Sequence, residues 1–168
     1  VKVRAIDKRK SNRDLEIMRE IFNDAWENNW NFVPFTEEEF RAVGKELMML
    51  LPPDYIQIAE MDGEPSAFIA LLPNINEVIS DLNGRLFPFG WAKLAWRLKV
   101  KSPKTARVAL MGVRQKYQNT RFGPGLAYIV IKAIMDMAAE RGIERAEMSW
   151  ILEHNHATRN IIESIGGK

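Results

Sequence analysis

The spacing of apolar and polar residues predicts a strand and two helices in the first third of the chain. Residues 1–6 alternate as a strand does, and residues 12–29 repeat apolar positions every three or four residues, which favours a helix. The apolar face of that helix would carry Leu15, Met18, Ile21, Phe22, Ala25 and Trp26. Thr36 and Glu39 have the spacing of a capping box, so a second helix is expected from there to about Leu50.

A hairpin and a further alternation of elements follow. Residues 55–60 and 65–72 are strand-like and flank Asp62-Gly63, a strong turn signal. The remaining predicted elements are a short helix over 75–82, a helix over 91–100, a strand over 106–113, a long helix to Arg141 ended by Gly142, a strand over 143–152 and a helix over 156–165. This order predicts an α/β (α+β) fold, in which a mixed, mostly antiparallel sheet is flanked by helices.

Composition limits the classes of function. A chain of 168 residues is expected to form a single domain, 1–168. A net charge of +2 gives no support to nucleic-acid binding, and without cysteine there is neither a disulfide framework nor a thiolate site. Two histidines are too few for a metal site, so none is expected. No signal-peptide pattern and no run of about twenty apolar residues is visible, so we expect a cytoplasmic protein without stable membrane insertion.

The segment after the strand over 106–113 is the most informative in the chain. It is basic, contains glycines, and leads directly into the long helix. N–H groups at a helix N-terminus have no intrahelical partner, and the helix dipole makes that end positive. Glycines let a phosphate approach the backbone closely. We therefore predict an anion site here, although neither G-x-G-x-x-G nor a Lys-Ser/Thr pair after the glycines is present.

The same segment resembles the acyl-CoA-binding motif of the GNAT superfamily of N-acetyltransferases, Arg/Gln-x-x-Gly-x-Gly/Ala. Gln118 and Gly123 match the first and last positions of the motif, with Arg121 at its middle glycine. A second register uses Gly125-Leu126-Ala127, which places Phe122 at the Arg/Gln position. The diphosphate would then lie on amides between residues 119 and 127, in a loop about one helical turn longer than usual.

The order of elements also resembles a GNAT domain, over nearly the whole chain. Residues 29–37, 83–90 and 147–153, together with Asn155, are similar to segments in the acetyltransferase domain of large GNAT-like bacterial proteins. The resemblance implies an acyl-CoA-dependent N-acyltransferase, with acetyl-CoA as co-substrate, in which an amine attacks the thioester directly. The cofactor-binding residues it implies are Met111, Gly112, Val113, Gln118, Asn119, Thr120, Arg121, Phe122, Gly123, Pro124, Gly125 and Asn155.

Two departures from the family pattern keep a second function open. A GNAT domain ends with two more strands, which would begin where this chain stops at Lys168. The resemblance thus implies a truncated domain, or a homodimer or partner strand at the open sheet edge. Ile162 stands where many family members have the tyrosine that protonates the leaving thiolate, so water, Tyr128 or a residue of the absent strands would have to replace it. The alternative function is a non-catalytic acyl-CoA-binding or scaffolding domain.

The candidate general bases are carboxylates on one strand. Glu147 and Glu153 share a face by the two-residue period of a strand, and either could take the proton of the amine. Glu60 is a further candidate, and a solvated or ion-paired role stays open for each. His154 and His156 are expected to be exposed, although one of them could serve as a base.

Aromatic residues are expected to bind the acceptor, a small-molecule or peptide amine. The substrate-binding candidates are Trp30, Phe32, Phe35 and Phe89. If several aromatic residues line a cleft, the acceptor has an apolar part larger than a simple sugar or polyamine. Several are instead expected to belong to the core, since aromatic residues at helical spacing usually do.

Overall fold

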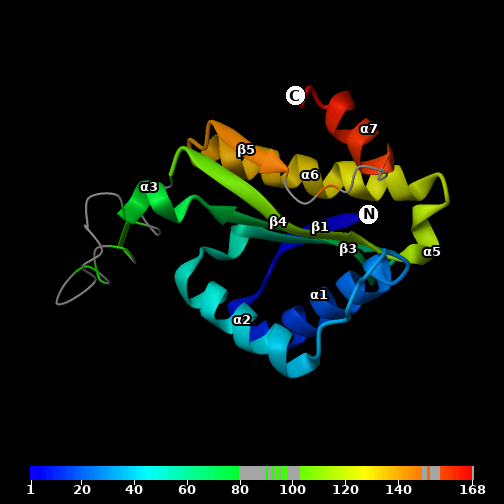
Figure 1. Cartoon of the computed structure of the whole chain (residues 1–168), viewed down its shortest axis with the longest axis horizontal. Coiled ribbons are helices and arrows are strands. Elements are labelled where there is room, and N and C mark those ends of the chain that lie inside the picture. Colours follow the sequence, from blue (N-terminus) through cyan, green and yellow to red (C-terminus); the bar gives the residue numbers. More distant parts are fainter. Residues whose placement is uncertain are drawn as a thin grey trace.

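Over the residues that it describes, the computed structural model of the chain is a five-stranded sheet with helices on both faces (Figure 1). These are residues 1–79, 103–148 and 156–167, together with residues 90, 92, 94, 96, 97 and 151. The strands are β1 (Lys2–Ala5), β2 (Ile56–Met61), β3 (Glu64–Pro73), β4 (Thr105–Val113) and β5 (Arg145–Met148). The helices are α1 (Ser11–Trp26), α2 (Glu37–Leu50), α3 (Ile75–Ile79), α5 (Gln115–Gln118), α6 (Phe122–Glu140) and α7 (His156–Ser164), with 3-10 turns at Lys8–Lys10 and Pro53–Tyr55.

The sheet has the order β1-β2-β3-β4-β5 and is antiparallel except for its β4–β5 pair, which is parallel. Helices α1 and α2 cover one face, α6 covers the other, and α7 lies beside α6 (Figure 1). A parallel pair requires a crossover connection, which α5 and α6 provide between β4 and β5. The predicted mixed, mostly antiparallel sheet flanked by helices is confirmed.

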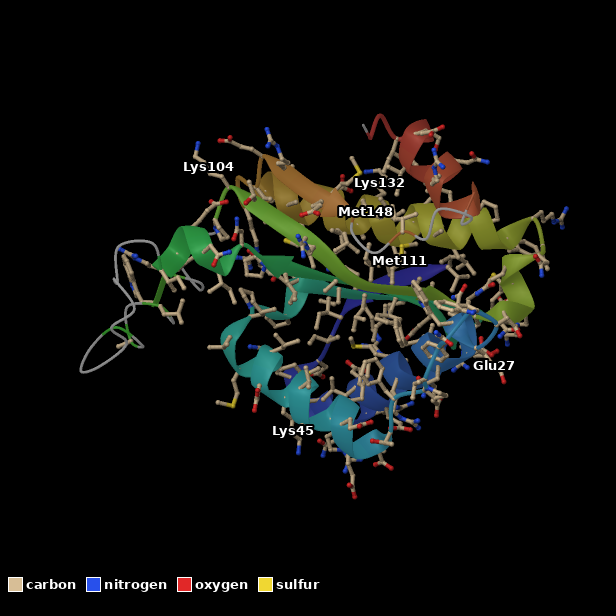
Figure 2. The ribbon with its side chains drawn as sticks, in the orientation of Figure 1. Glu27, Lys45, Lys104, Met111, Lys132 and Met148 are labelled. Atoms are coloured by element: carbon tan, nitrogen blue, oxygen red, sulfur yellow. The ribbon has the colours of Figure 1, made fainter. Side chains whose placement is uncertain are left out.

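Strand β3 is the centre of the core. Its side chains alternate between the faces, so that Phe68 packs with the α1 and α2 layer while Ile69 and Leu71 pack with α6. All three are fully buried. Figure 2 shows side chains from both layers filling the space between the sheet and the helices. The sheet is thus held by a hydrophobic cluster on each face.

A buried ion pair joins the start of α1 to the sheet. The carboxylate of Asp14, which is 2% exposed, accepts hydrogen bonds of 2.9 and 2.8 Å from the Arg4 guanidinium and one of 2.7 Å from the Asp7 N–H. Arg4 also donates to Glu60 at 2.8 Å. Burial by itself raises the pKa of the Asp14 carboxyl, but the hydrogen bonds from Arg4 and Asp7 outweigh it, so the pKa is lowered. This cluster connects β1, β2 and α1.

The predicted helix cap and the predicted hairpin turn are both confirmed. The Thr36 hydroxyl accepts from the Glu39 N–H at 3.2 Å, and the Glu39 carboxylate accepts from the Thr36 N–H at 3.1 Å, which is the capping box of α2. Asp62 and Gly63 have φ of 53° and 82°, as the tight hairpin between β2 and β3 requires.

Helix α6 packs one apolar face against the sheet and ends before Gly142, which has a φ of 71°. Among the described residues it is the one helix long and apolar enough, by length and composition, to cross a membrane, with a mean hydropathy of 1.3. The sequence pattern predicts no apolar run long enough to span a membrane, so this helix differs from that expectation. Because 44% of the helix window is buried, and core helices meet the same test, this is weak evidence for a span.

The structure corrects three predicted boundaries. Helix α1 ends at Trp26 instead of near residue 29, because the Asn29 N–H bonds back to the Trp26 carbonyl in a turn. Residues 115–118 form α5, a helical turn that the sequence did not predict. Helix α6 begins at Phe122, so the predicted glycine loop is the first turn of a helix.

Other predicted elements are described only in part. Strand β5 covers residues 145–148 of the predicted 143–152, and α3 covers 75–79 of the predicted 75–82. The predicted helix over 91–100 lies largely outside the described residues.

Candidate functional site

Strand β4 is paired on both sides along its first half only. Residues 105–108 pair with β5, whereas in the described part of the chain residues 110–113 pair only with β3. The register with β3 shifts by one residue at Ala109, which is a β-bulge. Such bulges bend a strand and often lie beside active sites. Over the described residues, an opening therefore lies on the β5 side of β4 just past the bulge, where Met148 and Ile151 line a pocket with β4.

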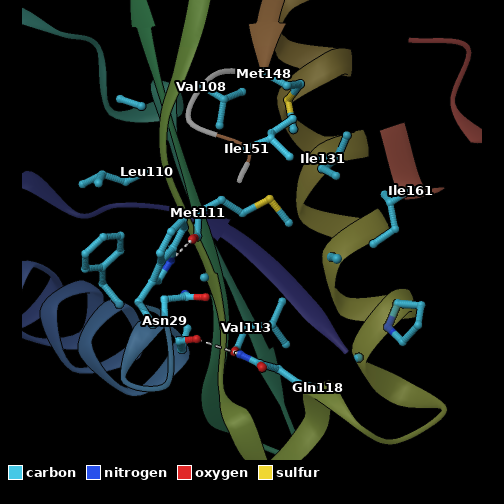
Figure 3. Close-up of a pocket in the computed structure, with 18 of the residues that line it drawn as sticks. Asn29, Val108, Leu110, Met111, Val113, Gln118, Ile131, Met148, Ile151 and Ile161 are labelled. Atoms are coloured by element: carbon cyan, nitrogen blue, oxygen red, sulfur yellow. Dashed lines mark hydrogen bonds between the residues drawn. The ribbon is translucent and has the colours of Figure 1, made fainter. Parts of the chain in front are cut away.

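This opening is a pocket of about 670 Å³ (Figure 3). Its described lining consists of Phe22, Ala25, Trp26, Asn29, Phe35, Val108, Ala109, Leu110, Met111, Gly112, Val113, Gln118, Asn119, Gly123, Pro124, Ala127, Ile131, Met148, Ile151 and Ile161. These residues come from both faces of the sheet, so the pocket passes between the α1 layer and the α6 layer. None of these side chains is a carboxylate, an imidazole, an amine or a phenol. The lining is apolar apart from three amide side chains.

The two halves of the pocket differ in character. The α6 half is aliphatic, with Ile131 and Ile161 on the side toward which Met111 points (Figure 3). The α1 half is aromatic. Phe22 lies 5.5 Å from the stacked ring of Trp26 and 5.6 Å from the ring of Phe35, measured between ring centroids. The aromatic half suits a bulky apolar group.

Side chains bind the carbonyl groups along the open edge of β4. The Trp26 indole N–H donates to the Met111 carbonyl at 3.0 Å, and the Gln118 amide donates to the Val113 carbonyl at 2.8 Å (Figure 3). Gln118 also donates to the carbonyl of Ala25 at 3.1 Å. Both donors therefore hold the end of β4 where it has no described β5 partner.

The end of α1 also holds α5. The Asp24 carboxylate accepts from the Gln115 N–H at 2.7 Å, at the start of α5, and the Gln115 side chain donates to the Asp24 carbonyl at 2.6 Å. Asn28 donates to the Gln115 side chain at 3.0 Å. No local pattern in the sequence marks these contacts or the Trp26 hydrogen bond, because they join positions about 90 residues apart.

The first turn of α6 lies at one end of the pocket. Two N–H groups of this turn already have partners in Thr120. The Thr120 hydroxyl accepts from the Phe122 N–H at 3.2 Å, and the Thr120 carbonyl accepts from the Gly123 N–H at 3.2 Å. Pro124 has no N–H. The predicted run of amides over residues 119–127 is thus reduced to fewer free donors. Arg121, whose guanidinium lies 5.0 Å from the Phe122 ring, has no carboxylate partner among the described residues and could supply positive charge.

The two predicted glycine registers differ in steric terms. A Cβ on Gly123 would lie 2.6 Å from the Tyr117 carbonyl oxygen and 2.8 Å from that of Gln118, so this glycine is needed by the fold itself. A Cβ on Gly125 would meet nothing within 4 Å. A side chain added at Gly125 would therefore clash with a ligand bound there and not with the protein.

The candidate bases lie apart from the described pocket lining or outside the described residues. Glu147 is half exposed on β5 and accepts from Arg107 at 2.9 Å, the neighbour it faces across the β4–β5 pair. Glu60 is paired with Arg4. Glu153 and Asn155 lie outside the described residues. Among the residues that are described, no three His, Cys, Asp or Glu side chains gather in a way that could hold a metal ion.

The predicted acceptor residues are spread over the loop after α1. Phe35 lines the pocket, while Phe32 packs against Phe22 with 5.8 Å between ring centroids. Trp30 is 81% exposed. Phe89 lies outside the described residues. Phe22 and Trp26, which the sequence placed on the core face of α1, line the pocket as well.

The chain is similar in sequence to two curated proteins over nearly its whole length. The chain is 55% identical over its whole length to protein YghO of Escherichia coli K12, covering 43% of that protein. It is 45% identical to a protein named bacterial ceramide synthase of Caulobacter vibrioides, covering 99% of this chain and 44% of the relative. The chain thus spans less than half the length of the curated relatives it matches.

A solved structure shows the same fold at low identity. Diaminobutyrate acetyltransferase EctA from Paenibacillus lautus, in complex with L-2,4-diaminobutyric acid and coenzyme A, superposes with a TM-score of 0.62 at 16% identity, covering 98% of this chain and 73% of that one. The model of the acetyltransferase (GNAT) family matches residues 15–166. With nine-tenths of its length matched, the chain belongs to the GNAT acetyltransferase family.

Proposed function

We propose that this chain is an N-acyltransferase that moves an acyl group from acyl-CoA to an amine. The observation that carries the proposal is the opening between β4 and β5, which lies beside the first turn of α6 and crosses from one face of the sheet to the other. The donor arm would enter from the α6 side, with its diphosphate near Gly125 and Arg121. The acceptor would enter from the α1 side. The two reactants would then meet at Met111.

The proposed reaction needs little covalent chemistry from the protein. The amine nitrogen forms a bond to the thioester carbonyl carbon, the carbon–sulfur bond breaks, and the thiolate leaves as the amine loses a proton. Positioning and stabilisation of the oxyanion are the contributions expected of the protein. The N–H groups on the open edge of β4 would stabilise the oxyanion. Glu153 stays our predicted base, because Glu147 would first have to leave Arg107.

The aromatic half of the pocket supports an acceptor with a long apolar chain. Phe22, Trp26 and Phe35 meet there, and no charged side chain lies in the described lining to bind a small polar acceptor. The name of the Caulobacter relative points the same way, since a ceramide is the amide of a long-chain amino alcohol. We propose a long-chain amine as the acceptor, with acetyl-CoA as the first donor to test.

The described pocket lining also favours a second candidate. It contains no titratable side chain, as a domain that binds acyl-CoA without turnover would allow. Such a domain would bind the donor through the same opening. Turnover separates the two candidates, because only the first consumes acyl-CoA.

The experiment measures the release of free thiol from acetyl-CoA and from a long-chain acyl-CoA. Each donor is combined with a long-chain amino alcohol or with ethanolamine, which has the same head group and no chain. We expect thiol release with the long-chain amine and little with ethanolamine. Equal rates with the two amines would contradict the acceptor class. Binding of acyl-CoA without thiol release would support the second candidate, and no binding would contradict both.

A further inference from the structure

Along the open edge of β4, the carbonyl groups have hydrogen-bond donors within the protein, whereas the N–H groups face the opening. The N–H of Arg114 donates to the Ser66 carbonyl of β3 at 2.9 Å. Because the direction alternates along a strand, the backbone groups of every second residue before Arg114 also point toward β3. Gly112 faces β3 in the same way, opposite Phe68. In an antiparallel strand, the N–H and C=O of one residue point to the same side. The N–H and C=O groups of Met111 and of Val113 therefore face the opening.

The two carbonyls that face the opening already have donors. Trp26 donates to the Met111 carbonyl at 3.0 Å, and Gln118 donates to the Val113 carbonyl at 2.8 Å. The N–H groups of the same two residues point to the same side. The edge therefore presents donors to a ligand, while its acceptors are used within the protein.

Close packing of α1 on β4 puts Trp26 within reach. A Cβ on Gly112 would lie 3.3 Å from atoms of Ala25, Ile21 and Phe68, tighter than ordinary contact, so the glycine lets the helix approach the strand. The Trp26 ring is further fixed by its stack on Phe22. Gly112, Trp26 and Met111 thus form one arrangement in which each part depends on the others.

We propose that Trp26 and Gln118 are positioning residues that make the open edge of β4 a row of donors for the carbonyl oxygens of the acyl-pantetheine arm. This inference rests on the proposed function. Each peptide unit of this edge has its other end on the β3 side, so the pairing with β3 sets the direction of the Met111 and Val113 groups. The two side chains occupy carbonyls that would otherwise repel the carbonyl oxygens of a ligand, so the edge offers its N–H groups, with that of Met111 facing the thioester oxygen. An unmade bond of this kind typically costs about fivefold in affinity.

The test compares acetyl-CoA with S-ethyl-CoA, a thioether of similar size that lacks the carbonyl oxygen. Calorimetry gives the affinity of each ligand for the wild-type chain, Trp26→Phe and Gln118→Met. Trp26→Phe keeps an aromatic ring on Phe22 but loses the indole N–H. We expect wild type to prefer acetyl-CoA by about fivefold and the preference to fall toward one in both variants. Trp96→Phe, the same substitution at a residue that is 61% exposed, should keep it.

Each result decides between distinct explanations. If wild type binds both ligands equally, or if Trp26→Phe keeps the preference, the positioning role is wrong while the proposed function stands. A loss of affinity that is equal for the two ligands would also contradict it, because it would indicate a merely structural role. If wild type binds neither ligand, the proposed function itself fails. Should Trp26→Phe not fold, Gly112→Ala provides the same test, since it moves α1 from β4 and keeps the indole.

Discussion

The two ends of helix α1 use polar groups in opposite ways. Near its start, the carboxylate of Asp14 is almost fully buried and receives its hydrogen bonds from Arg4 and the Asp7 N–H. At its end, Asp24 and Trp26 are half-buried beside the pocket and bind backbone groups of α5 and β4. A buried charge stabilises the fold away from the pocket. Half-buried hydrogen bonds hold backbone groups in place beside the pocket, where we propose that the ligand enters.

The largest expected effect is the loss of the buried charge. Asp14→Asn leaves the Arg4 guanidinium with Glu60 alone, so the free energy of unfolding should fall by about 3 kcal/mol. Urea denaturation measures this, and the affinity of the folded variant for acetyl-CoA should match wild type. Arg9→Ala is the control, because the Arg9–Asp7 pair is exposed and its loss should leave stability unchanged. A variant that unfolds like wild type but binds acetyl-CoA poorly would show that Asp14 acts on ligand binding instead of on the fold.

The same carboxylate should give the chain a pH-dependent stability. Its folded-state pKa is lowered, so its contribution is complete above the unfolded pKa of about 3.8 and is lost as the pH falls through the lower folded value. The difference in unfolding free energy between wild type and Asp14→Asn should therefore shrink as the pH falls below about 4. Urea denaturation from pH 7 to pH 3 measures it. A difference that stays constant over this range would show that the charge of Asp14 is not the cause.

A smaller effect is expected from crowding the start of α6. Gly123→Ala places a methyl group within 2.8 Å of two carbonyl oxygens, so the unfolding free energy should fall by roughly 1–3 kcal/mol. Thermal and urea denaturation measure this without any ligand. Wild-type stability would mean that α5 and α6 are not packed together as described.

The matched change at Gly125 should affect the ligand and leave the fold intact. Gly125→Val adds a side chain into open space, so stability should not fall. If the diphosphate lies here, the affinity for acetyl-CoA should decrease at least tenfold, which corresponds to about 1.4 kcal/mol. Calorimetry with acetyl-CoA measures it. Unchanged affinity would place the diphosphate elsewhere along the α6 turn.

The sequence predicted those parts of the fold that local patterns determine. The apolar face of α1, the capping box at Thr36 and the turn at Asp62 were all readable from spacing, and each is present. The sequence also predicted an anion site at the start of the long helix, where Gly123 and Pro124 line the pocket, and ligand binding there stays a prediction. These features depend on residues within one or two turns of each other.

What the sequence did not predict depends on contacts between distant segments. Helix α5 is capped by Asp24, and the Met111 carbonyl is bound by Trp26, 85 positions away. The spacing of Trp26 indicated a core residue, and only the packing of α1 on Gly112 shows that it also reaches the open edge. Likewise, Glu147 had the periodicity of a candidate base, but its cross-strand neighbour Arg107 binds its carboxylate.

The central claim is that acyl-CoA lies in the opening between β4 and β5. A crystal structure of the chain with CoA tests it most directly. The account predicts the pantetheine arm along Met111 and Val113, its carbonyl oxygens facing their N–H groups, and the diphosphate against the first turn of α6 near Gly125. Electron density for CoA anywhere else on the protein, with the opening empty, would contradict the account.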